Sequence, residues 1–330
     1  MSGTAIVVVT RNSAEVVGAC LESCLRSGAA EVVVVDNAST DPTLSQVRGF
    51  DGVRLIANRE NLGFAAAVNQ GVRATTEPFV LLLNPDAELA GGVAELEAAC
   101  SEPGVAAAAG LLVGEDGEAQ RGFSVRRLPT TAALVFETLG LNRLWPSNPV
   151  NRRYRCLDLD LSLEQDIEQP AGAFLLLRRD AWKQLAGFDE RFYPVWFEDV
   201  DFCRRLSDAG YRVRLAPSAR ARHRGGSSFL GVARQVRIVW WHRSLLKYAS
   251  RHFRAASRCT VCGAVLAGAV LRMVTGMFTE MGSGGAIRVY GKVISFALAC
   301  LWSGRAWAAA CDAESRERAD AAASSIQLEK

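Results

Sequence analysis

Two acidic motifs lie far apart in the sequence and carry side chains suited to group-transfer chemistry. The first is Asn84-Pro85-Asp86, which follows the apolar run Phe79–Leu83, and the second is Phe197-Glu198-Asp199-Val200-Asp201. A carboxylate can hold a divalent metal ion, and another can accept a proton from an attacking hydroxyl group. Each motif alone is a weak signal. Together they indicate one site in which a metal-bound diphosphate and a proton acceptor take part.

The Asn84-Pro85-Asp86 motif is suited to binding Mg²⁺ or Mn²⁺. These ions prefer oxygen ligands and keep part of their coordination for water and phosphate, so few protein groups are needed. Asp86 would supply one ligand and His223 the second, while Asn84 adds a weaker dipole than a carboxylate would. A simple turn at Asn84 and a surface histidine at position 223 are the alternatives. The neighbours of His223 that could contact phosphate oxygens are Arg222, Arg224 and Ser227.

The second motif predicts the proton acceptor. We assign this role to Asp199, because a positioned carboxylate can take the proton of an attacking hydroxyl group, and we expect Glu198 to orient the acceptor or the base. Acidic residues are also favoured at a helix N-terminus by the macrodipole. That alternative does not account for the neighbouring aromatic residues Trp196 and Phe197, which are suited to packing on a sugar ring.

Polar residues also follow the predicted strands near the N-terminus. A carboxylate at a strand end can bind a nucleobase or a ribose hydroxyl, and a glycine lets the backbone approach a ligand at the start of a helix. Turn formation, helix capping and helix packing explain these residues equally well. The candidates for donor binding are Thr10, Asn12, Asp36, Asn37, Asn61, Gly63 and Asn69.

These side chains need a framework, and the sequence predicts an α/β fold. Apolar runs at 5–9, 31–35, 53–57 and 79–83 predict strands, and helices are expected over 14–27 and 65–74. This alternation is typical of a mostly parallel sheet flanked by helices, which binds ligands at the carboxyl ends of its strands. Beyond an irregular insertion at 114–169, we predict strands at 173–178 and 212–215 and a helix at 199–207. Residues 1–235 are the expected catalytic domain.

Residues 236–330 form a predicted helical extension of different character. Thirteen of the 38 Arg and Lys residues, and none of the 35 acidic residues, lie between Asp208 and Glu280. Basic residues at 243, 247, 251, 254 and 258 predict one amphipathic helix that binds an anionic membrane surface, with a solvated helix as the alternative. The apolar runs 259–271 and 293–302 are each too short to span a membrane. The aromatic residues do not alternate with basic ones, so no nucleic acid partner is expected.

Six segments, taken in order, resemble the inverting family 2 glycosyltransferases with the GT-A fold, over about residues 3–230. Within that family, the chain is most similar to bacterial rhamnosyltransferase-like enzymes of cell-wall and O-antigen assembly. Position 11, which is often aromatic in the family, is Arg11 here and could instead reach a phosphate. The segments are VVVVDNASTD (32–41), NLGFAAAVNQG (61–71), LLLNPDAEL (81–89), GAFLLLRRDAW (172–182), GFDERFYPVWFEDVDFCRRL (187–206) and HRGGSS (223–228).

The resemblance implies roles for individual residues. Asp86 and His223 would hold the metal and the diphosphate, and Asp199 would be the base. Gly172 would lie at the acceptor site, together with Trp196 and Phe197. The residues expected to hold the nucleoside are Thr10, Asn12, Asp36 and Asn61.

The resemblance also implies a reaction. We expect transfer of L-rhamnose from dTDP-rhamnose, with inversion, to a lipid-linked or cell-surface glycan. UDP-galactofuranose, UDP-glucose and UDP-GlcNAc are alternative donors. The expected location is peripheral, at the cytoplasmic face of the inner membrane. A degenerate transferase acting as a membrane-surface scaffold remains an alternative. A nucleotidyltransferase is disfavoured, because residues 10–17 form neither a glycine-rich nor a basic loop.

Overall fold

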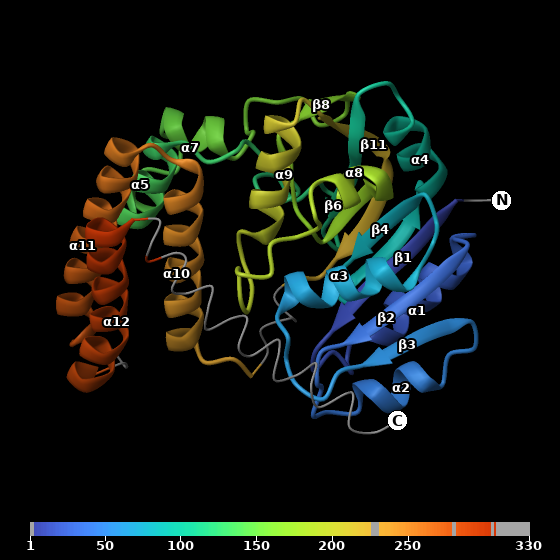
Figure 1. Cartoon of the computed structure of the whole chain (residues 1–330), viewed down its shortest axis with the longest axis horizontal. Coiled ribbons are helices and arrows are strands. Elements are labelled where there is room, and N and C mark those ends of the chain that lie inside the picture. The colour runs from blue at the N-terminus through green and yellow to red at the C-terminus, as the bar shows by residue number, and fades with distance from the viewer. Residues whose placement is uncertain (1–2, 226–230, 279–281, 305–306, 308–330) are drawn as a thin grey trace. The chain divides into compact units, whose positions relative to one another are not determined.

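The computed structural model describes residues 3–225, 231–278, 282–304 and 307 (Figure 1). The chain divides into two compact units, and each is described by itself. The first unit comprises Met1–Leu128, Arg155–Glu190 and Glu198–Leu230, and the second comprises Pro129–Tyr154, Arg191–Phe197 and Gly231–Lys330. The boundary expected between residues 235 and 236 falls in the first turn of helix α10 (Arg234–His252).

The first unit is built on a mixed sheet with the strand order β3-β2-β1-β4-β10-β6-β11-β5, and β8 pairs with β11. Strands β3, β2, β1 and β4 are parallel, which confirms the predicted parallel core. Strand β10 is antiparallel to both β4 and β6, so the sheet is mixed around this parallel core. The bounds are β1 Thr4–Thr10, β2 Glu31–Asp36, β3 Val53–Ala57, β4 Phe79–Leu83, β5 Ala87–Gly91, β6 Val105–Val113, β8 Gln165–Ile167, β10 Phe174–Arg178 and β11 Arg212–His223; β7 (Val125–Arg126) and β9 (Gln169–Pro170) form a separate ladder.

Helices cover both faces of this sheet (Figure 1). Side chains alternate along a strand, so Val7 packs into one buried cluster while Ile6 and Val8 pack into the other. Helix α3 approaches β1 closely, because a Cβ on Gly71 would lie 2.4 Å from Val7 Cγ1. Helices α3 (Phe64–Ala74), α8 (Arg179–Gln184) and α9 (Glu198–Asp208) contribute to the first cluster, and α1 (Val17–Arg26), α2 (Thr43–Arg48) and α4 (Val93–Cys100) to the second.

The sheet brings the carboxyl ends of its parallel strands together. The Asn37 N–H donates to the Thr10 carbonyl oxygen (2.8 Å), and the Asn58 N–H donates to the Asp36 carbonyl oxygen (2.9 Å). At the other edge, β11 pairs with β5 so that His223 lies opposite Ala87. This register places His223 beside the residue that precedes Ala87, which is Asp86.

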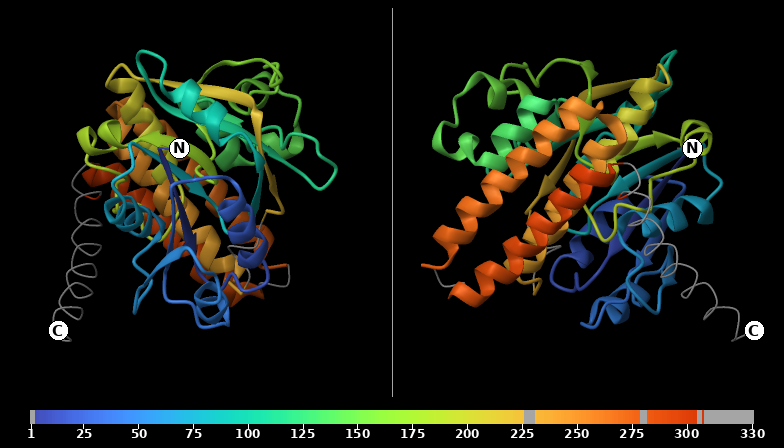
Figure 2. Two further views of the ribbon diagram at one scale, coloured as in Figure 1. Left: turned by 90° about the vertical axis from the view of Figure 1, so that its right-hand side faces the viewer. Right: turned by 60° about the vertical axis from the view of Figure 1, so that its left-hand side comes forward.

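The second unit is helical within the part of the chain that the structure describes. Its three long helices, α10, α11 and α12, lie side by side (Figure 2). The other helices come from the predicted irregular insertion and include α5, which packs against α11. The bounds are α5 Thr131–Leu139, α6 Leu141–Leu144, α7 Pro149–Tyr154, α10 Arg234–His252, α11 Ala255–Gly276 and α12 Gly282–Ser303.

The single basic helix predicted over residues 243–258 is wrong. Helix α10 ends at His252, and Phe253 has an extended backbone (φ −100°, ψ 146°) before α11 begins. Lys247 is buried and donates to the carbonyl oxygen of Arg191. The Arg243 guanidinium lies 6.0 Å from the ring centroid of Phe296. Lys247 and Arg243 thus make contacts within the second unit, whereas their helical spacing had predicted binding to a membrane surface.

The apolar segments at the C-terminus are longer than predicted. Helices α11 and α12 each contain 22 residues, and both are long and apolar enough to cross a membrane. Arg272, at which the predicted apolar run ends, lies inside α11. In the structure the Arg272 guanidinium donates to the carbonyl oxygens of Thr138 (2.5 Å) and Gly268 (3.1 Å), so the helix continues past it.

Candidate functional site

Asp36 is fully buried at the end of β2 and organises two strand-end loops. Its Oδ1 accepts hydrogen bonds from the hydroxyl groups of Thr10 (2.9 Å) and Ser39 (2.5 Å). Asn12, at φ +52°, donates its N–H to the Ser39 hydroxyl (2.8 Å) and accepts at Oδ1 from the Thr40 N–H (2.8 Å). The structure therefore brings Thr10, Asn12 and Asp36 together at the carboxyl ends of β1 and β2.

A second group of strand-end residues surrounds Asn37. Its amide nitrogen donates to Asn61 Oδ1 (2.8 Å) and to the Gly63 carbonyl oxygen (3.2 Å). Its Oδ1 accepts from the Leu62 N–H (2.9 Å). Gly63 has φ +86°, which favours glycine, immediately before α3 begins. Asn37, Asn61 and Gly63 thus form one braced loop.

Asn69 was predicted to face the same ligand, and this is wrong. Its amide nitrogen donates to the Phe188 carbonyl oxygen (2.8 Å) and to Glu190 Oε1 (2.8 Å). Its Oδ1 accepts from Trp182 Nε1 (3.2 Å) and from the Phe188 N–H (2.9 Å). With four protein partners and 1% exposure, this side chain holds the loop around Phe188 and has no capacity left for a ligand.

Asp86 and His223 meet as a carboxylate and imidazole pair. His223 Nε2 lies 3.4 Å from Asp86 Oδ1, and both residues are buried. The ring of Phe123 stacks on the imidazole, with centroids 5.2 Å apart and planes inclined by 9°. The backbone of Asn84 also joins two elements here, since its N–H donates to the Ala173 carbonyl oxygen (3.0 Å).

This pair is chemically suited to a divalent cation. Oxygen and imidazole nitrogen are both ligands for Mn²⁺-type ions, and a diphosphate with water can complete the coordination. In the described part of the chain, no group of three or more His, Cys, Asp and Glu side chains is arranged to hold a metal. Among the described residues, Asp86 and His223 are therefore the ligands that this pair would supply. This fits an ion that is shared with a bound diphosphate.

The basic residues near His223 have acidic neighbours. Arg222 and Arg224 lie 3.8 Å and 3.9 Å from carboxylate oxygens of Glu88. These distances mark loose, exposed ion pairs, which contribute little stability. Ser227 lies outside the described residues.

Asp199 lies in the first turn of α9 and is held by backbone N–H groups. Its Oδ2 accepts from Gly172 (3.1 Å) and its Oδ1 from Val200 (2.8 Å). Gly172 approaches closely, because a Cβ there would lie 3.2 Å from Asp199 Cβ. Burial raises the pKa of Asp199, and the two N–H groups and the positive charge of Arg126 oppose that rise. A carboxylate of raised pKa that remains hydrogen-bonded is suited to accepting a proton.

Glu198, Trp196 and Phe197, which were also predicted for the acceptor site, differ from one another in burial and in backbone conformation. Burial, and next the charge of Asp199, raise the pKa of Glu198 well above its usual value. Trp196 and Phe197 adopt positive φ angles of 77° and 69°. Phe197 is buried in the second unit, where its ring lies 5.6 Å from that of Tyr248 and 6.3 Å from that of Trp241. It therefore packs in an aromatic cluster of its own unit.

Several residues of the site were missed from the sequence. Gln120 contacts His223, and Gln169 Nε2 lies 3.4 Å from Asp199 Oδ2. Ser39, which donates to Asp36 Oδ1, is not among the predicted donor-binding residues. Gln120, Phe123 and Arg126 lie in the insertion that was interpreted as irregular surface. No periodicity or motif in that stretch could have indicated them, because their role depends on contacts distant in sequence.

Comparison with known proteins finds similar sequences and a similar fold. The model of glycosyl transferase family 2 matches residues 5–184, and that of glycosyl transferase family group 2 matches residues 166–308. The chain is 32% identical over 252 residues to the N-acetylglucosaminyl-diphospho-decaprenol L-rhamnosyltransferase of Mycobacterium tuberculosis, covering 71% of this chain and 80% of that protein. Rhamnosyltransferase WbbL of Escherichia coli K12 is 25% identical over 209 residues, covering 61% of this chain and 72% of that protein.

A solved structure shares the fold. The mannosyltransferase PcManGT from Pyrobaculum calidifontis, solved in complex with GDP-Man and Mn²⁺, superimposes with a TM-score of 0.51 at 18% identity, covering 91% of this chain and 87% of that chain. Its identity is low, so it supports the GT-A fold alone. The family 2 model matches more than half of the chain. The mycobacterial relative is similar to this chain over most of its own length. The protein therefore belongs to glycosyl transferase family 2 and is a glycosyltransferase of the GT-A fold.

Proposed function

We propose that this glycosyltransferase moves L-rhamnose from dTDP-rhamnose to a hydroxyl group of a lipid-linked glycan, with inversion at the anomeric carbon. The similarity to a mycobacterial enzyme named for rhamnosyl transfer to N-acetylglucosaminyl-diphospho-decaprenol supports both the sugar and the acceptor class. The observation that supports the proposal is that the first unit holds two separate groups of side chains suited to this chemistry. Asp86 and His223 form one, and Asp199 braced by Gly172 forms the other.

The strand-end loops would bind the donor. Asp36 orders the loops after β1 and β2, which gives Thr10 and Asn12 fixed positions for a nucleoside. The loop of Asn37, Asn61 and Gly63 leads into α3 and would face the sugar nucleotide. Asp86 and His223, with Asn84 nearby, would hold Mg²⁺ or Mn²⁺ on the diphosphate. When bound, that ion neutralises the charge that develops on the leaving diphosphate.

Asp199 would act on the acceptor. Its carboxylate takes the proton of the acceptor hydroxyl while that oxygen attacks the anomeric carbon opposite the diphosphate. The bond to the diphosphate breaks as the new glycosidic bond forms, so the configuration inverts. The Gly172 N–H would fix the base, and Glu198, whose pKa burial raises, would orient the acceptor or the base from the first turn of α9. Phe197 would support its own segment from within its aromatic cluster.

A donor screen tests this proposal. Thermal unfolding of the protein is measured with dTDP-rhamnose, UDP-galactofuranose, UDP-glucose, UDP-GlcNAc and GDP-mannose, each with and without Mn²⁺. We expect metal-dependent stabilisation by dTDP-rhamnose that is lost in Asp86→Ala and kept in Asp116→Ala, a control in an exposed turn. Selective stabilisation by another sugar nucleotide would correct the donor. Stabilisation by none, with no sugar transfer to a polyprenyl-diphosphate glycan, would favour the scaffold alternative.

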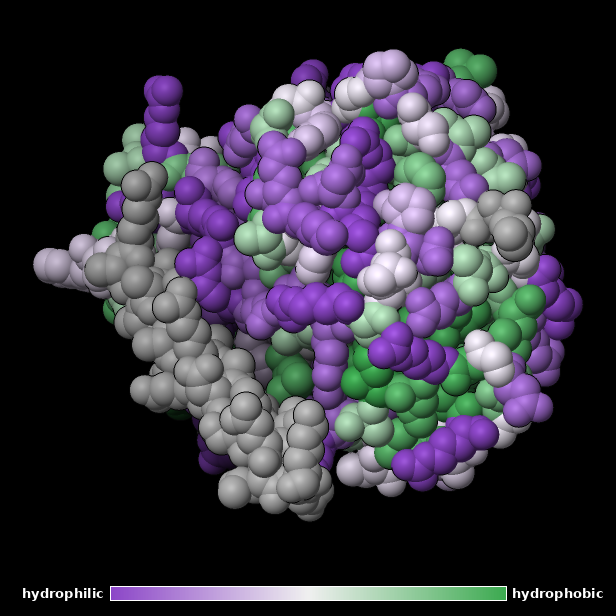
Figure 3. All heavy atoms as spheres, turned by 45° about the vertical axis from the view of Figure 1, so that its right-hand side comes forward, coloured by the Kyte–Doolittle hydropathy of each residue, from purple (hydrophilic) through white to green (hydrophobic). Residues whose placement is uncertain are grey.

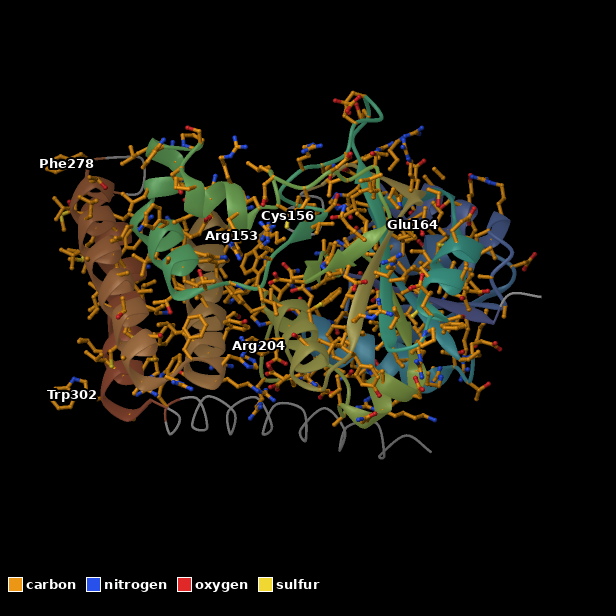
Figure 4. All side chains as sticks on the ribbon, turned by 90° about the horizontal axis from the view of Figure 1, so that it is seen from above. Arg153, Cys156, Glu164, Arg204, Phe278 and Trp302 are labelled. Atoms are coloured by element: carbon orange, nitrogen blue, oxygen red, sulfur yellow. The ribbon has the colours of Figure 1, made fainter. Side chains whose placement is uncertain are left out.

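Helices α11 and α12 provide the proposed attachment to the membrane that carries the acceptor. Their exposed apolar residues recur at helical spacing. The side chains of Phe278 and Trp302, each 86% exposed, extend away from opposite ends of the helix pair (Figure 4). The exposed large apolar residues are Val270, Leu271, Val274 and Phe278 after or along α11, and Ile287, Leu298 and Trp302 on α12.

The charge of these helices favours an anionic lipid surface as their partner. Figure 3 shows apolar surface among hydrophilic side chains on another view of the molecule. Apolar exposure alone therefore does not distinguish a membrane-binding surface. Helices α11 and α12 contain no acidic residue, and α12 exposes Arg288 and Lys292. A second copy docked on the same face would bring like charges together, whereas anionic headgroups attract them. We propose peripheral binding at the cytoplasmic face of the inner membrane.

Vesicle binding tests this attachment. The protein is sedimented with vesicles of phosphatidylcholine alone or mixed with phosphatidylglycerol. We expect preference for the anionic vesicles, and a loss of at least about tenfold in affinity for the double variant Phe278→Ser and Trp302→Ser, since burying one large apolar side chain contributes about 1.5–3 kcal/mol. Leu163→Ser is the control, because Leu163 is 58% exposed in the first unit. Unchanged binding of the double variant would overturn the attachment.

A further inference from the structure

Gln120 contacts His223 through both ends of its carboxamide, although the two residues are 103 positions apart. Its Nε2 donates to the His223 carbonyl oxygen (2.7 Å), and its Oε1 lies 2.9 Å from His223 Nδ1. The Gln120 backbone is fixed as well. Its N–H donates to the Leu112 carbonyl oxygen (2.8 Å), and its carbonyl oxygen accepts from the Ser124 N–H (2.9 Å).

These contacts determine the protonation pattern of the imidazole. A backbone carbonyl oxygen can only accept, so the group that faces the His223 carbonyl must be the amide nitrogen of Gln120. The carboxamide oxygen then faces Nδ1, and this oxygen can only accept. In the neutral imidazole the proton therefore lies on Nδ1, and the lone pair lies on Nε2.

The lone pair on Nε2 is directed toward a carboxylate. Nε2 lies 3.4 Å from Asp86 Oδ1, so two acceptor atoms face each other. A cation held between the two atoms would relieve their repulsion. Phe123, stacked 5.2 Å from the imidazole, fixes the orientation of the ring plane. The ring is thus held in the state in which Nε2 can ligate a metal.

We infer that Gln120 is a positioning residue that holds His223 as the Nδ1–H tautomer, with Nε2 directed toward Asp86 for a divalent cation. The inference rests on the proposed metal site. It adds Gln120 as a residue that does not bind the metal itself but orients the ligand His223. Residues in this role typically change metal affinity by about 10–100-fold when replaced. The acceptor oxygen at Nδ1 is the part of Gln120 that matters for the tautomer.

Two substitutions separate positioning from simple bracing. Gln120→Leu removes both hydrogen bonds, whereas Gln120→Glu keeps an acceptor for the Nδ1–H, replaces the donor to the backbone by an oxygen and adds a negative charge. Gln165→Leu is the matched control, because Gln165 also donates to a backbone carbonyl, that of Leu163 (3.3 Å), in an exposed part of the first unit.

The first readout is the histidine tautomer in the metal-free protein. The chain has three histidines, so ¹⁵N-labelled histidine gives few signals, and those lost in His223→Gln are assigned to His223. At alkaline pH we expect a protonated Nδ1 and an unprotonated Nε2 in the wild type and in Gln120→Glu. In Gln120→Leu we expect a mixture of both tautomers.

The second readout is binding of Mn²⁺ alone, measured from the paramagnetic resonance of the free ion. We expect Gln120→Leu to lose about 10–100-fold in affinity, Gln120→Glu to stay within a few-fold of the wild type, and Gln165→Leu to be unchanged. A protonated Nε2 in the wild type, or equal losses in the Leu and Glu variants, would overturn the inference. If the wild type binds no Mn²⁺, the proposed metal site fails, and the tautomer experiment still decides the role of Gln120.

Discussion

Replacing Asp199 with Asn removes the proposed base and keeps the size of the side chain. A carboxamide is not basic, so the acceptor hydroxyl would attack without a positioned proton acceptor. Such catalysis contributes about 10²–10⁴-fold to the rate. This factor corresponds to about 3–5 kcal/mol of barrier, and we expect kcat to fall accordingly.

The same substitution should also lower the stability of the fold. In the structure Oδ2 accepts from the Gly172 N–H and Oδ1 from the Val200 N–H. A carboxamide has one oxygen, so its NH₂ group must face one of these two donors. Leaving a partly buried donor without an acceptor costs about 1–3 kcal/mol, and we expect the free energy of unfolding to fall by about that amount.

The pH dependence gives an independent check. Burial raises the pKa of Asp199, and a base is active only when ionised. Activity should therefore fall as the pH decreases through this raised pKa, so that the acidic limb of kcat/KM lies above the usual Asp range. The limb should be absent in Asp199→Asn, which has no carboxylate to protonate.

Single-turnover sugar transfer measures the chemical step, with donor binding followed separately by calorimetry. Asp208→Asn is the control, because Asp208 lies exposed at the opposite end of α9. We expect Asp199→Asn to bind the donor normally and to lose turnover. A variant that keeps more than about a tenth of the wild-type kcat, against the expected 10²–10⁴-fold loss, would refute the role of Asp199.

Three further substitutions test other parts of the structure. Arg126→Gln removes a positive charge that lowers the pKa of Asp199, so the acidic limb of kcat/KM should move to higher pH; an unmoved limb would contradict the electrostatic link. Arg205→Met removes the ion pair to the buried Asp201 carboxylate (2.7 Å) and should lower the free energy of unfolding in urea by about 3–5 kcal/mol. Asn69→Leu should lower that free energy by about 2–4 kcal/mol while the donor Kd of the folded protein stays unchanged, and a selective loss of donor affinity would restore a ligand role for Asn69.

Much of the fold could be predicted because local patterns encode it. Buried runs such as Val32–Val35 predict strands, and the spacing of small and apolar residues predicts α3. Strand β6 (Val105–Val113) went unnoticed, although all nine residues are buried, because four consecutive alanines have weak strand preference. The antiparallel direction of β10 was also unpredictable, since its apolar run is the same in either direction.

The sequence by itself determined the reaction class, the polar residues at the strand ends and the acidic start of α9. These depend on residue type and short spacing, which the chain carries locally. Only the tertiary structure decided which groups meet. The pairing of β5 with β11 brings His223 to Asp86, a loop from the insertion brings Gln120 to His223, and Lys247 turns into its own unit. A hydrophobic pattern specifies that a side chain is buried, whereas its partner is chosen by packing between segments distant in the chain.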